Sequence, residues 1–278
     1  MATSYPSTIP IELYRPIFQN LTSIRHLYPL LWVSKAFHAE VEPVMYQTIV
    51  LRPLPCNNGD ITLVHHFAAS PRLASLVRRL NIPNIGPRQI DNPESYWYTV
   101  HLALKQMINL RHLNTDNSLS YGQIVPARQA CLLEGCRFQL RTLIFRSILT
   151  NHMSFLESQA AELEELICFH ATGPYWPSKG VSYPRMKVLG FDAAEIIRVS
   201  DAMPHVKAIQ WTGGIANPDW TDLKPFERIR ALNIHFFRAG TITAIGICFS
   251  SLIYLKCTLL SEDRNMVQSC PPIDPMWA

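Results

Sequence analysis

The sequence predicts an α/β chain in which a module of three short helices precedes a curved solenoid with a parallel sheet. Two observations support this prediction. Apolar residues recur at helical spacing in residues 9–50, and a six-residue pattern, apolar-x-x-apolar-x-apolar, recurs from Val77 onward. We therefore divide the chain into a flexible N-terminus (1–8), a helical module (9–50), a connector (51–74), a solenoid (75–260) and a C-terminal tail (261–278).

The first helix of the module is expected to begin after Thr8, whose hydroxyl suits an N-cap, with Pro10 close to the first helical position. Pro16 falls inside this helix. Because a proline removes a backbone donor and costs about 3 kcal/mol in a helix interior, we expect the helix to kink or to begin late. The apolar positions that define the helix are Ile11, Leu13, Tyr14, Ile17, Phe18 and Leu21.

The second and third helices meet at Ser34, whose hydroxyl is predicted to cap a helix from Lys35 to about Val41. Pro43 is expected to end that helix. Three helices within about 40 residues bury only a small core, so the module should be stable only against a neighbour. The apolar cluster that precedes Ser34 comprises Leu27, Leu30, Leu31 and Val33.

The stretches IPIELYRPIF and LLWVSKAFHAEVEPVMYQTIVL resemble the F-box, whose usual form is LPxEL…IF…L…LLxLxxVSRxFH…EPxLYxxIxL, in the style of mushroom-forming fungi. The resemblance implies binding to a Skp-family adaptor and, through it, to a cullin. This sequence departs from the family at Ile9, where Leu is usual, and at Pro16, where an acidic or polar residue is common. An F-box fold without adaptor binding therefore stays open. The positions that match the adaptor-contact motif are Ile9, Pro10, Ile11, Leu13, Ile17, Leu30, Val33, Ser34 and Phe37.

The six-residue pattern occurs eight times, and the last five start-to-start intervals are 23, 23, 20, 23 and 23 residues. These intervals lie within the range of about 20 to 29 residues that is typical of leucine-rich repeats. The two earlier intervals, 33 and 30 residues, are longer. The copies are VRRLNI from Val77, LRHLNT from Leu110, LRTLIF from Leu140, LEELIC from Leu163, MKVLGF from Met186, VKAIQW from Val206, IRALNI from Ile229 and LIYLKC from Leu252.

The last four residues of each copy alternate apolar and polar side chains, which predicts a short strand. Segments between copies read as helices: SYWYTVHLALKQMI carries an apolar stripe at Tyr96, Val100, Leu104 and Ile108, and HMSFLESQAAE precedes Leu163. Residues 75–260 thus resemble the degenerate leucine-rich arrays found behind fungal F-boxes, although an irregular α/β domain with chance spacing is the alternative. Turns are expected at Gly173-Pro174, Gly213-Gly214 and Asn217-Pro218.

The run from Ala239 to Leu260 contains a single charge, Lys256, and is long enough to cross a bilayer. A tail anchor is one interpretation. The repeat explains the same residues as a buried helix at 241–249 followed by a strand at 252–257, so we expect no membrane association.

Composition and motifs indicate a binding protein. The chain has no GxSxG, GxGxxG, GxxxxGK[ST] or HExxH motif, so we expect no enzyme activity and no cofactor. Seven scattered cysteines without a CxxC, and no secretory signal pattern, indicate a reducing cytoplasmic or nuclear compartment and no metal. Nucleic acid is not an expected partner, since the net charge is only +4 and the Lys and Arg residues form no runs.

The inner face of the solenoid is the expected working surface, because every second strand residue points there. Its side chains are mostly neutral and include apolar ones, which suits a protein target. Together the two resemblances imply a substrate-recognition adaptor of an SCF-type E3 ubiquitin ligase, acting in ubiquitin-dependent protein degradation on an unknown target. The alternative is a non-ligase interaction scaffold in which the helices cap the repeats. The candidate target-binding residues are Ile144, Glu165, Ile167, Phe169, Asp192, Gln210, Asn233, His235 and Tyr254.

Overall fold

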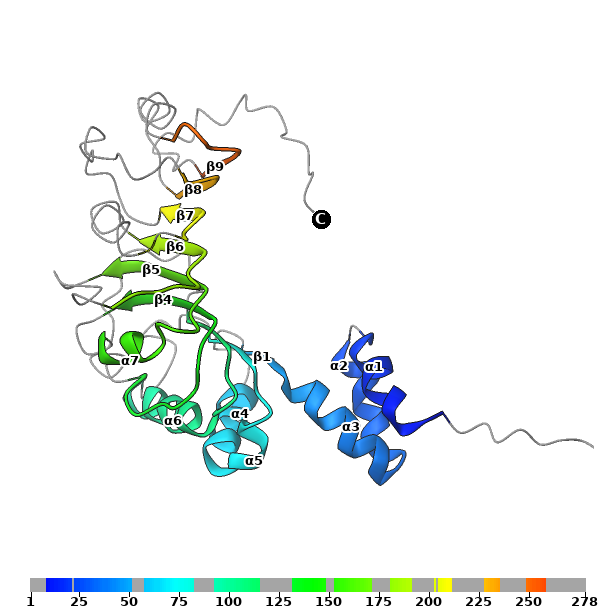
Figure 1. The fold of residues 1–278 in the computed structure, drawn as a ribbon. Helices are drawn as coiled ribbons and strands as arrows, with labels where there is room; N and C mark the ends of the chain where they lie inside the picture. The colour runs from blue at the N-terminus through cyan, green and yellow to red at the C-terminus, as the bar shows by residue number, and fades with distance from the viewer. Residues whose placement is uncertain are drawn as a thin grey trace, which may run out of the picture.

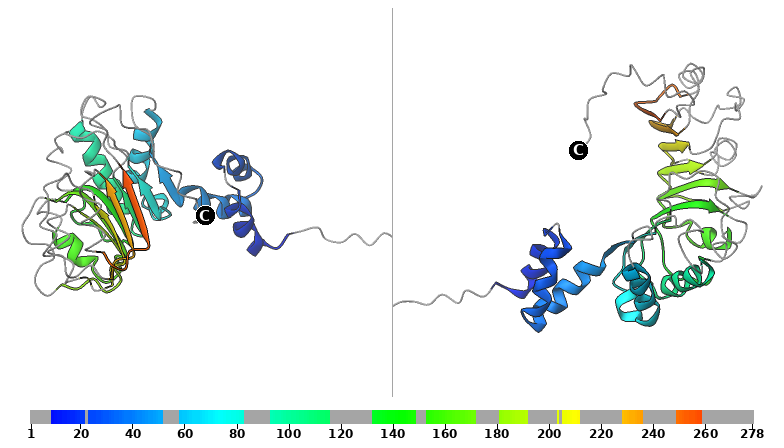
Figure 2. Two further views of the ribbon diagram at one scale, coloured as in Figure 1. Left: turned by 90° about the horizontal axis from the view of Figure 1, so that it is seen from above. Right: turned by 180° about the vertical axis from the view of Figure 1, so that it is seen from behind.

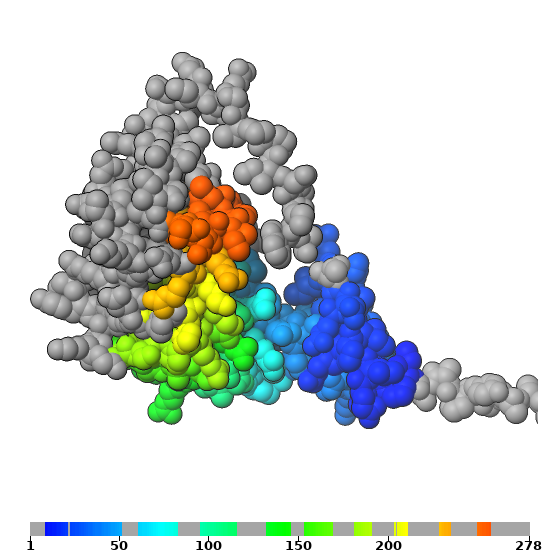
Figure 3. Space-filling view, turned by 45° about the horizontal axis from the view of Figure 1, so that its top comes forward, coloured from blue at the N-terminus to red at the C-terminus, as the bar shows by residue number. Residues whose placement is uncertain are grey.

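The computed structural model describes residues 9–21, 23–51, 58–82, 93–115, 132–148, 153–171, 181–191, 203, 205–211, 228–235 and 249–258. The described chain has two parts, a small helical module and a tall parallel sheet with helices on one side (Figure 1). In the space-filling view the module stands beside the solenoid as a separate lobe (Figure 3).

The helical module consists of η1 (Ile11–Leu13), α1 (Tyr14–Gln19), α2 (Ile24–Leu27), η2 (Tyr28–Trp32) and α3 (Lys35–Tyr46). Its core is small and separate from that of the solenoid, with Phe18, Leu27 and Val41 buried at its centre. The Phe37 ring lies 4.6 Å from Tyr14 and 5.3 Å from Phe18, measured between ring centroids, so aromatic packing joins α1 to α3.

The sequence rules for helix caps and for prolines hold at some positions of the module and fail at another. Ser34 caps α3 as predicted, its Oγ accepting a hydrogen bond from the backbone N–H of Phe37 at 3.1 Å. The α-helix at Pro16 begins late, at Tyr14 after a 3-10 turn, which places Pro16 in the first turn of α1. The expected end of α3 at Pro43 is wrong, since the helix continues to Tyr46. Packing of Tyr46 on Phe67 of α4 (Asn58–Ala69) stabilises the turn beyond the proline.

The strands of the described residues, nine in number, form one sheet in sequence order with every pair parallel, which confirms the α/β class and the parallel sheet. Each of the eight predicted copies supplies a strand that starts two residues after the copy begins. The strands from these copies are β2 (Arg79–Asn81), β3 (His112–Asn114), β4 (Thr142–Ile148), β5 (Glu165–Ala171), β6 (Val188–Phe191), β7 (Ala208–Trp211), β8 (Ala231–His235) and β9 (Tyr254–Thr258).

A ninth strand, β1 (Thr48–Val50), pairs with β2 and was not among the predicted copies. The sequence YQTIVL from Tyr46 fits the same six-residue pattern, and β1 also starts two residues after it begins. The sheet therefore starts inside the range expected for the helical module. Only Gln47 lies between the end of α3 and the start of β1.

The described helices of the solenoid lie on one face of its N-terminal half (Figures 1 and 2). They are α4 (Asn58–Ala69), α5 (Pro71–Ala74), α6 (Pro93–Gln106) and α7 (Met153–Ser158), and α4 packs against α6. Tyr96, Val100 and Leu104 are buried as predicted, whereas Ile108 follows the end of α6 and is exposed. The expected turns at 173–174, 213–214 and 217–218, and the expected helix at 241–249, lie outside the described residues.

One row of apolar side chains runs through the sheet from β1 to β9 in register, and eight of its nine members are buried. Burying each such side chain contributes roughly 1.5 to 3 kcal/mol, so this row is a main source of solenoid stability. Within the described chain, no helix is both long and apolar enough to cross a membrane. The row comprises Ile49, Leu80, Leu113, Leu143, Leu166, Leu189, Ile209, Leu232 and the half-buried Leu255.

Candidate functional site

Exposed apolar side chains gather on the helical module. Of the thirteen large hydrophobic residues that are exposed in the described part of the chain, eight lie between residues 9 and 33. We call this set the apolar face of the module. Its members are Ile9, Ile11, Leu13, Ile17, Ile24, Tyr28, Trp32 and Val33.

The structure divides the nine expected adaptor-contact residues into three groups. Leu30 and Phe37 are half-buried and pack against the core of the module, so they support the fold. Ser34 is exposed, and its Oγ is engaged as the cap of α3. The residues that remain are exposed: Val33 lies between η2 and α3, and the others lie on η1, α1 or the segment just before them, namely Ile9, Pro10, Ile11, Leu13 and Ile17.

Three members of the apolar face, Ile24, Tyr28 and Trp32, were not among the predicted contacts. They lie on α2 and η2, spaced four residues apart, and all three are exposed. Ile24 and Tyr28 share one side of the α-helical turn, since residues four apart do so in an α-helix. Trp32 follows in a 3-10 helix, where side chains three apart eclipse, so the spacing alone does not predict its direction. Leu27, between them, is buried.

The helical module contacts the solenoid near the C-terminal end of α3. The Arg72 guanidinium of α5 donates two hydrogen bonds to the Glu42 carboxylate, at 2.5 and 2.8 Å. This bond holds the pKa of Glu42 below its ordinary value, although partial burial acts in the opposite direction. Next to the ion pair, the Tyr46 and Phe67 rings pack edge to face with centroids 5.8 Å apart. The module is thus joined to the first repeat by polar and aromatic contacts together.

We call the side of the sheet opposite the buried apolar row its open face. It carries the side chains of the strand residues directly before and after each member of that row. Four of the expected target-binding residues lie there half-buried, and Tyr254 is exposed. Phe169 and His235 lie in β5 and β8, but their side chains are outside the described ones, and Asp192 lies outside the described residues. The four half-buried residues are Ile144, Glu165, Gln210 and Asn233.

Ile167 was expected to be an exposed contact residue, and this expectation is wrong. Its side chain is only 5% exposed. The cause is Gly190, its register partner on β6, which has no side chain and leaves room for Ile167 to lie against the sheet. The open face is therefore less apolar in its middle than the sequence suggests.

His112 lies on the same face, on β3. Burial lowers the pKa of its imidazole below the ordinary value of 6.5, and the nearby Arg79 and Arg141 guanidinium groups lower it further. The Glu164 carboxylate acts weakly in the opposite direction.

The described residues contain no cluster of metal ligands, and no protein-family model matches the chain. Among the residues that the structure describes, no three His, Cys, Asp or Glu side chains come together as metal ligands would. Comparison with protein-family models and with curated proteins gives no match to this chain.

Proposed function

We propose that this protein is the substrate-recognition adaptor of an SCF-type E3 ubiquitin ligase. The helical module binds a Skp-family adaptor, and through it a cullin, while the solenoid binds a target protein. The observation that carries the proposal is the apolar face of the module, a concentration of exposed hydrophobic residues that monomeric proteins rarely leave uncovered.

The apolar face has the composition of a helical docking interface. Its residues are large aliphatic and aromatic side chains, the types that act as anchors when a partner excludes water from them. Leu13 and Ile17 are four residues apart, so they lie on one side of η1 and α1. The residues beneath them, Phe18 and Phe37, pack inside the module, which holds the exposed anchors on a defined surface.

The alternative, a non-ligase scaffold whose helices cap the repeats, is less well supported. A capping unit buries its apolar residues against the neighbouring repeat. Here the core of the module is separate from the core of the solenoid, and the apolar face is exposed. The contacts with the solenoid come instead from Glu42 and Tyr46, near the end of α3.

The proposal is tested by co-expressing the full chain with a Skp-family adaptor and measuring how much adaptor is retained. We expect the wild type to retain the adaptor and the double variant Leu13→Asp/Ile17→Asp to lose it by at least about tenfold, because two apolar anchors become charged. Leu13 and Ile17 are 49% and 43% exposed, so the changes should leave folding intact, as far-UV circular dichroism will check.

The matched control is Ile108→Asp, which places the same charge at an exposed isoleucine of the solenoid, 56% accessible. It should retain the adaptor as the wild type does. The proposal fails if the wild type retains no adaptor, or if the double variant retains as much as the control.

Pro16→Glu separates the ligase adaptor from the scaffold. Pro16 is the third residue of α1, where a backbone N–H has no acceptor within the helix, so the proline removes no helical hydrogen bond. We therefore expect Pro16→Glu to leave adaptor retention unchanged. Retention that appears only in the Glu variant would favour the scaffold.

A further inference from the structure

The residue that precedes each strand from β2 to β9 forms a second row, along one edge of the sheet. The backbone N–H of Arg111 donates to the carbonyl of Arg78 at 2.9 Å, and an equivalent bond links each member to the next as far as Ile253. Neighbouring members are therefore one strand apart, about 4.8 Å, and the whole row is about 34 Å long. We call it the edge row. In order, its members are Arg78, Arg111, Arg141, Glu164, Lys187, Lys207, Arg230 and Ile253.

The edge row concentrates the positive charge of the protein. Six of its members are cations and one is a carboxylate, so its formal charge is +5, whereas the whole chain carries +4. All six cations are exposed. Neighbouring cations of the row are 20 or more residues apart in the sequence, which is why the sequence contains no basic run. The register of the strands brings them into one line.

Charge in the middle of the edge row is partly neutralised within the protein. The Glu164 carboxylate accepts a hydrogen bond from the Lys187 Nζ at 2.5 Å, and its Oε1 lies 3.9 Å from the Arg141 Nε. The hydrogen bond from Lys187 is the main reason that the pKa of Glu164 is lowered. The middle of the row therefore attracts an anion less strongly than its ends do.

The two ends of the edge row keep their charge. Arg78 and Arg111 lie at one end, and Lys207 and Arg230 lie towards the other. Among the described residues, none of these four side chains forms an ion pair with a carboxylate. The Arg111 guanidinium donates to the backbone carbonyl of Gln139 at 3.0 Å, a bond that positions the group and leaves its charge uncompensated. The row thus presents two separated pairs of cations to solvent.

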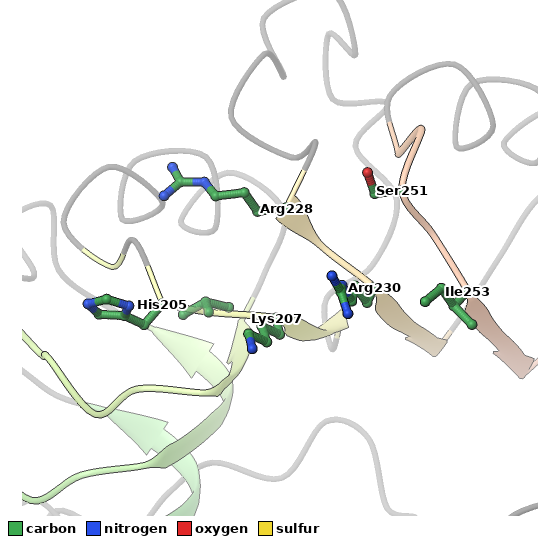
Figure 4. A pocket seen from close by; sticks show the side chains of 7 residues that line it. His205, Lys207, Arg228, Arg230, Ser251 and Ile253 are labelled. Atoms are coloured by element: carbon green, nitrogen blue, oxygen red, sulfur yellow. The ribbon is translucent and has the colours of Figure 1, made fainter.

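Exposed apolar side chains follow the cations at the C-terminal end of the edge row. Ile253 is 75% exposed, and Tyr254, the next residue, is 45% exposed. Figure 4 shows Ile253, Arg230 and Lys207 around one hollow, whose cavity volume is about 530 Å³. Arg228 also lines this hollow, but it has an interaction of its own and adds less free charge. Cations beside an exposed isoleucine and tyrosine are typical of surfaces that rest in the interfacial region of a bilayer.

We propose that the edge row binds an anionic phospholipid membrane. A lipid surface is broad enough to meet both ends of the row at once, and Lys and Arg side chains within a Debye length of it are attracted to its charge. This inference goes beyond the proposed function, since it places the protein at a membrane surface whether or not the helical module binds an adaptor. The expectation of no membrane association concerned insertion of the apolar run at 239–260, which is a different segment.

A nucleic acid fits the edge row less well than a membrane does. Single strands are bound by a groove of cations that follows the backbone, combined with aromatic side chains on which the bases stack. The middle of the row is partly neutralised by Glu164, and none of the eight members is aromatic.

The experiment measures co-sedimentation of the full chain with vesicles of phosphatidylcholine that contain about 30% phosphatidylserine, at physiological ionic strength. We expect binding to these vesicles and none to vesicles of phosphatidylcholine alone. Two variants, Lys207→Gln/Arg230→Gln and Arg78→Gln/Arg111→Gln, should each weaken binding at least about tenfold, because each removes two cations from one end of the row. The control Arg25→Gln/Lys35→Gln removes two exposed cations from the helical module and should bind as the wild type does.

Two further variants test what the surface recognises. Lys207→Arg/Arg230→Lys should bind as the wild type does, because a membrane surface responds to charge and does not require the fork geometry of a particular guanidinium. Ile253→Ser should weaken binding about threefold or more, because it removes an apolar contact with the lipid interface. Far-UV circular dichroism checks that every variant is folded.

Several outcomes overturn the inference. These are no sedimentation with either kind of vesicle, equal binding to both, equal weakening by an edge-row variant and the control, and a single-stranded RNA that binds more tightly than the anionic vesicles. Weakening by the Lys207 and Arg230 variant alone would also overturn it, since the site would then be local and not the row. Adaptor retention, measured on the same variants, should stay at the wild-type level, so failure of one proposal is distinguishable from failure of the other.

Discussion

Replacing Gly190 by alanine should destabilise the sheet, because β6 has no room for a methyl group at this position. A Cβ on Gly190 would lie 2.9 Å from Cγ2 and 3.0 Å from Cγ1 of Ile167, and 3.2 Å from the backbone oxygen of Gln210. Carbon atoms in favourable contact are about 3.5 to 4.0 Å apart. The backbone of Gly190 is outside the left-handed region, so the expected effect comes from crowding alone.

The magnitude follows from two opposing effects. Overpacking a well-filled site costs about 1 to 3 kcal/mol, and alanine in a strand is favoured over glycine by about 0.5 to 1 kcal/mol. The difference is about 0 to 2.5 kcal/mol, and we expect Gly190→Ala to lower the free energy of unfolding by an amount near the middle of that range, about 1 kcal/mol. Ile167→Ala alone should cost about 2 to 5 kcal/mol, since it removes a buried side chain.

The double variant distinguishes crowding from a general loss of stability. With alanine at position 167 the two atoms closest to the new methyl group are gone, so Gly190→Ala should then cost close to nothing. Urea unfolding of the wild type, the two single variants and the double variant, followed by far-UV circular dichroism, measures this coupling. The explanation is refuted if Gly190→Ala costs the same with isoleucine and with alanine at position 167.

Three further predictions concern titratable groups. Arg72→Ala should lower the free energy of unfolding slightly at neutral pH. Because Arg72 depresses the pKa of Glu42, the difference from wild type should be fully present above about pH 4.5 and shrink as the pH falls through the Glu42 pKa. A difference in the free energy of unfolding that stays constant from about pH 7 to about pH 3 in urea titrations would contradict this. Because the pKa of His112 is lowered on folding, wild-type stability should decline as the pH falls below 6.5, and His112→Gln should decline less over that range. Burial raises the pKa of the Cys136 thiol to about 12, so mass spectrometry should find this residue unlabelled by maleimide at pH 8 in the native protein and labelled after unfolding.

The strands were predictable because the repeat leaves a strong local signal. Each copy contributes one apolar residue to the buried row, and the alternation of side chains marks the strand around it. The strand β1 escaped prediction because residues 46–50 were assigned to the helical module, whose F-box-like pattern includes YQTIVL, and the repeat was therefore traced only from Val77. At Pro43 a local rule failed since contacts made by the following turn outweigh the effect of the proline.

The candidate site was less predictable because its properties depend on register between distant residues. Ile167 is buried by a glycine 23 positions later, and no pattern within one copy reveals that neighbour. On the helical module, spacing identifies helical sides but does not tell which apolar side is buried. Ile24, Tyr28 and Trp32 therefore required the structure.

The single residue that joins the helical module to the sheet has a geometric consequence. The carbonyl of Gln47 accepts hydrogen bonds from the N–H groups of Arg78 and Arg79, at 2.9 and 3.0 Å, so the joint is itself part of the ladder. A partner bound to the module and one bound to the solenoid are then held at a fixed separation and angle, unlike partners on a flexible tether. In a ligase, that fixed separation would determine which lysines of a bound target reach the ubiquitin-loaded enzyme. Whether a target is modified would then depend on the position of its lysines as well as on its binding to the solenoid.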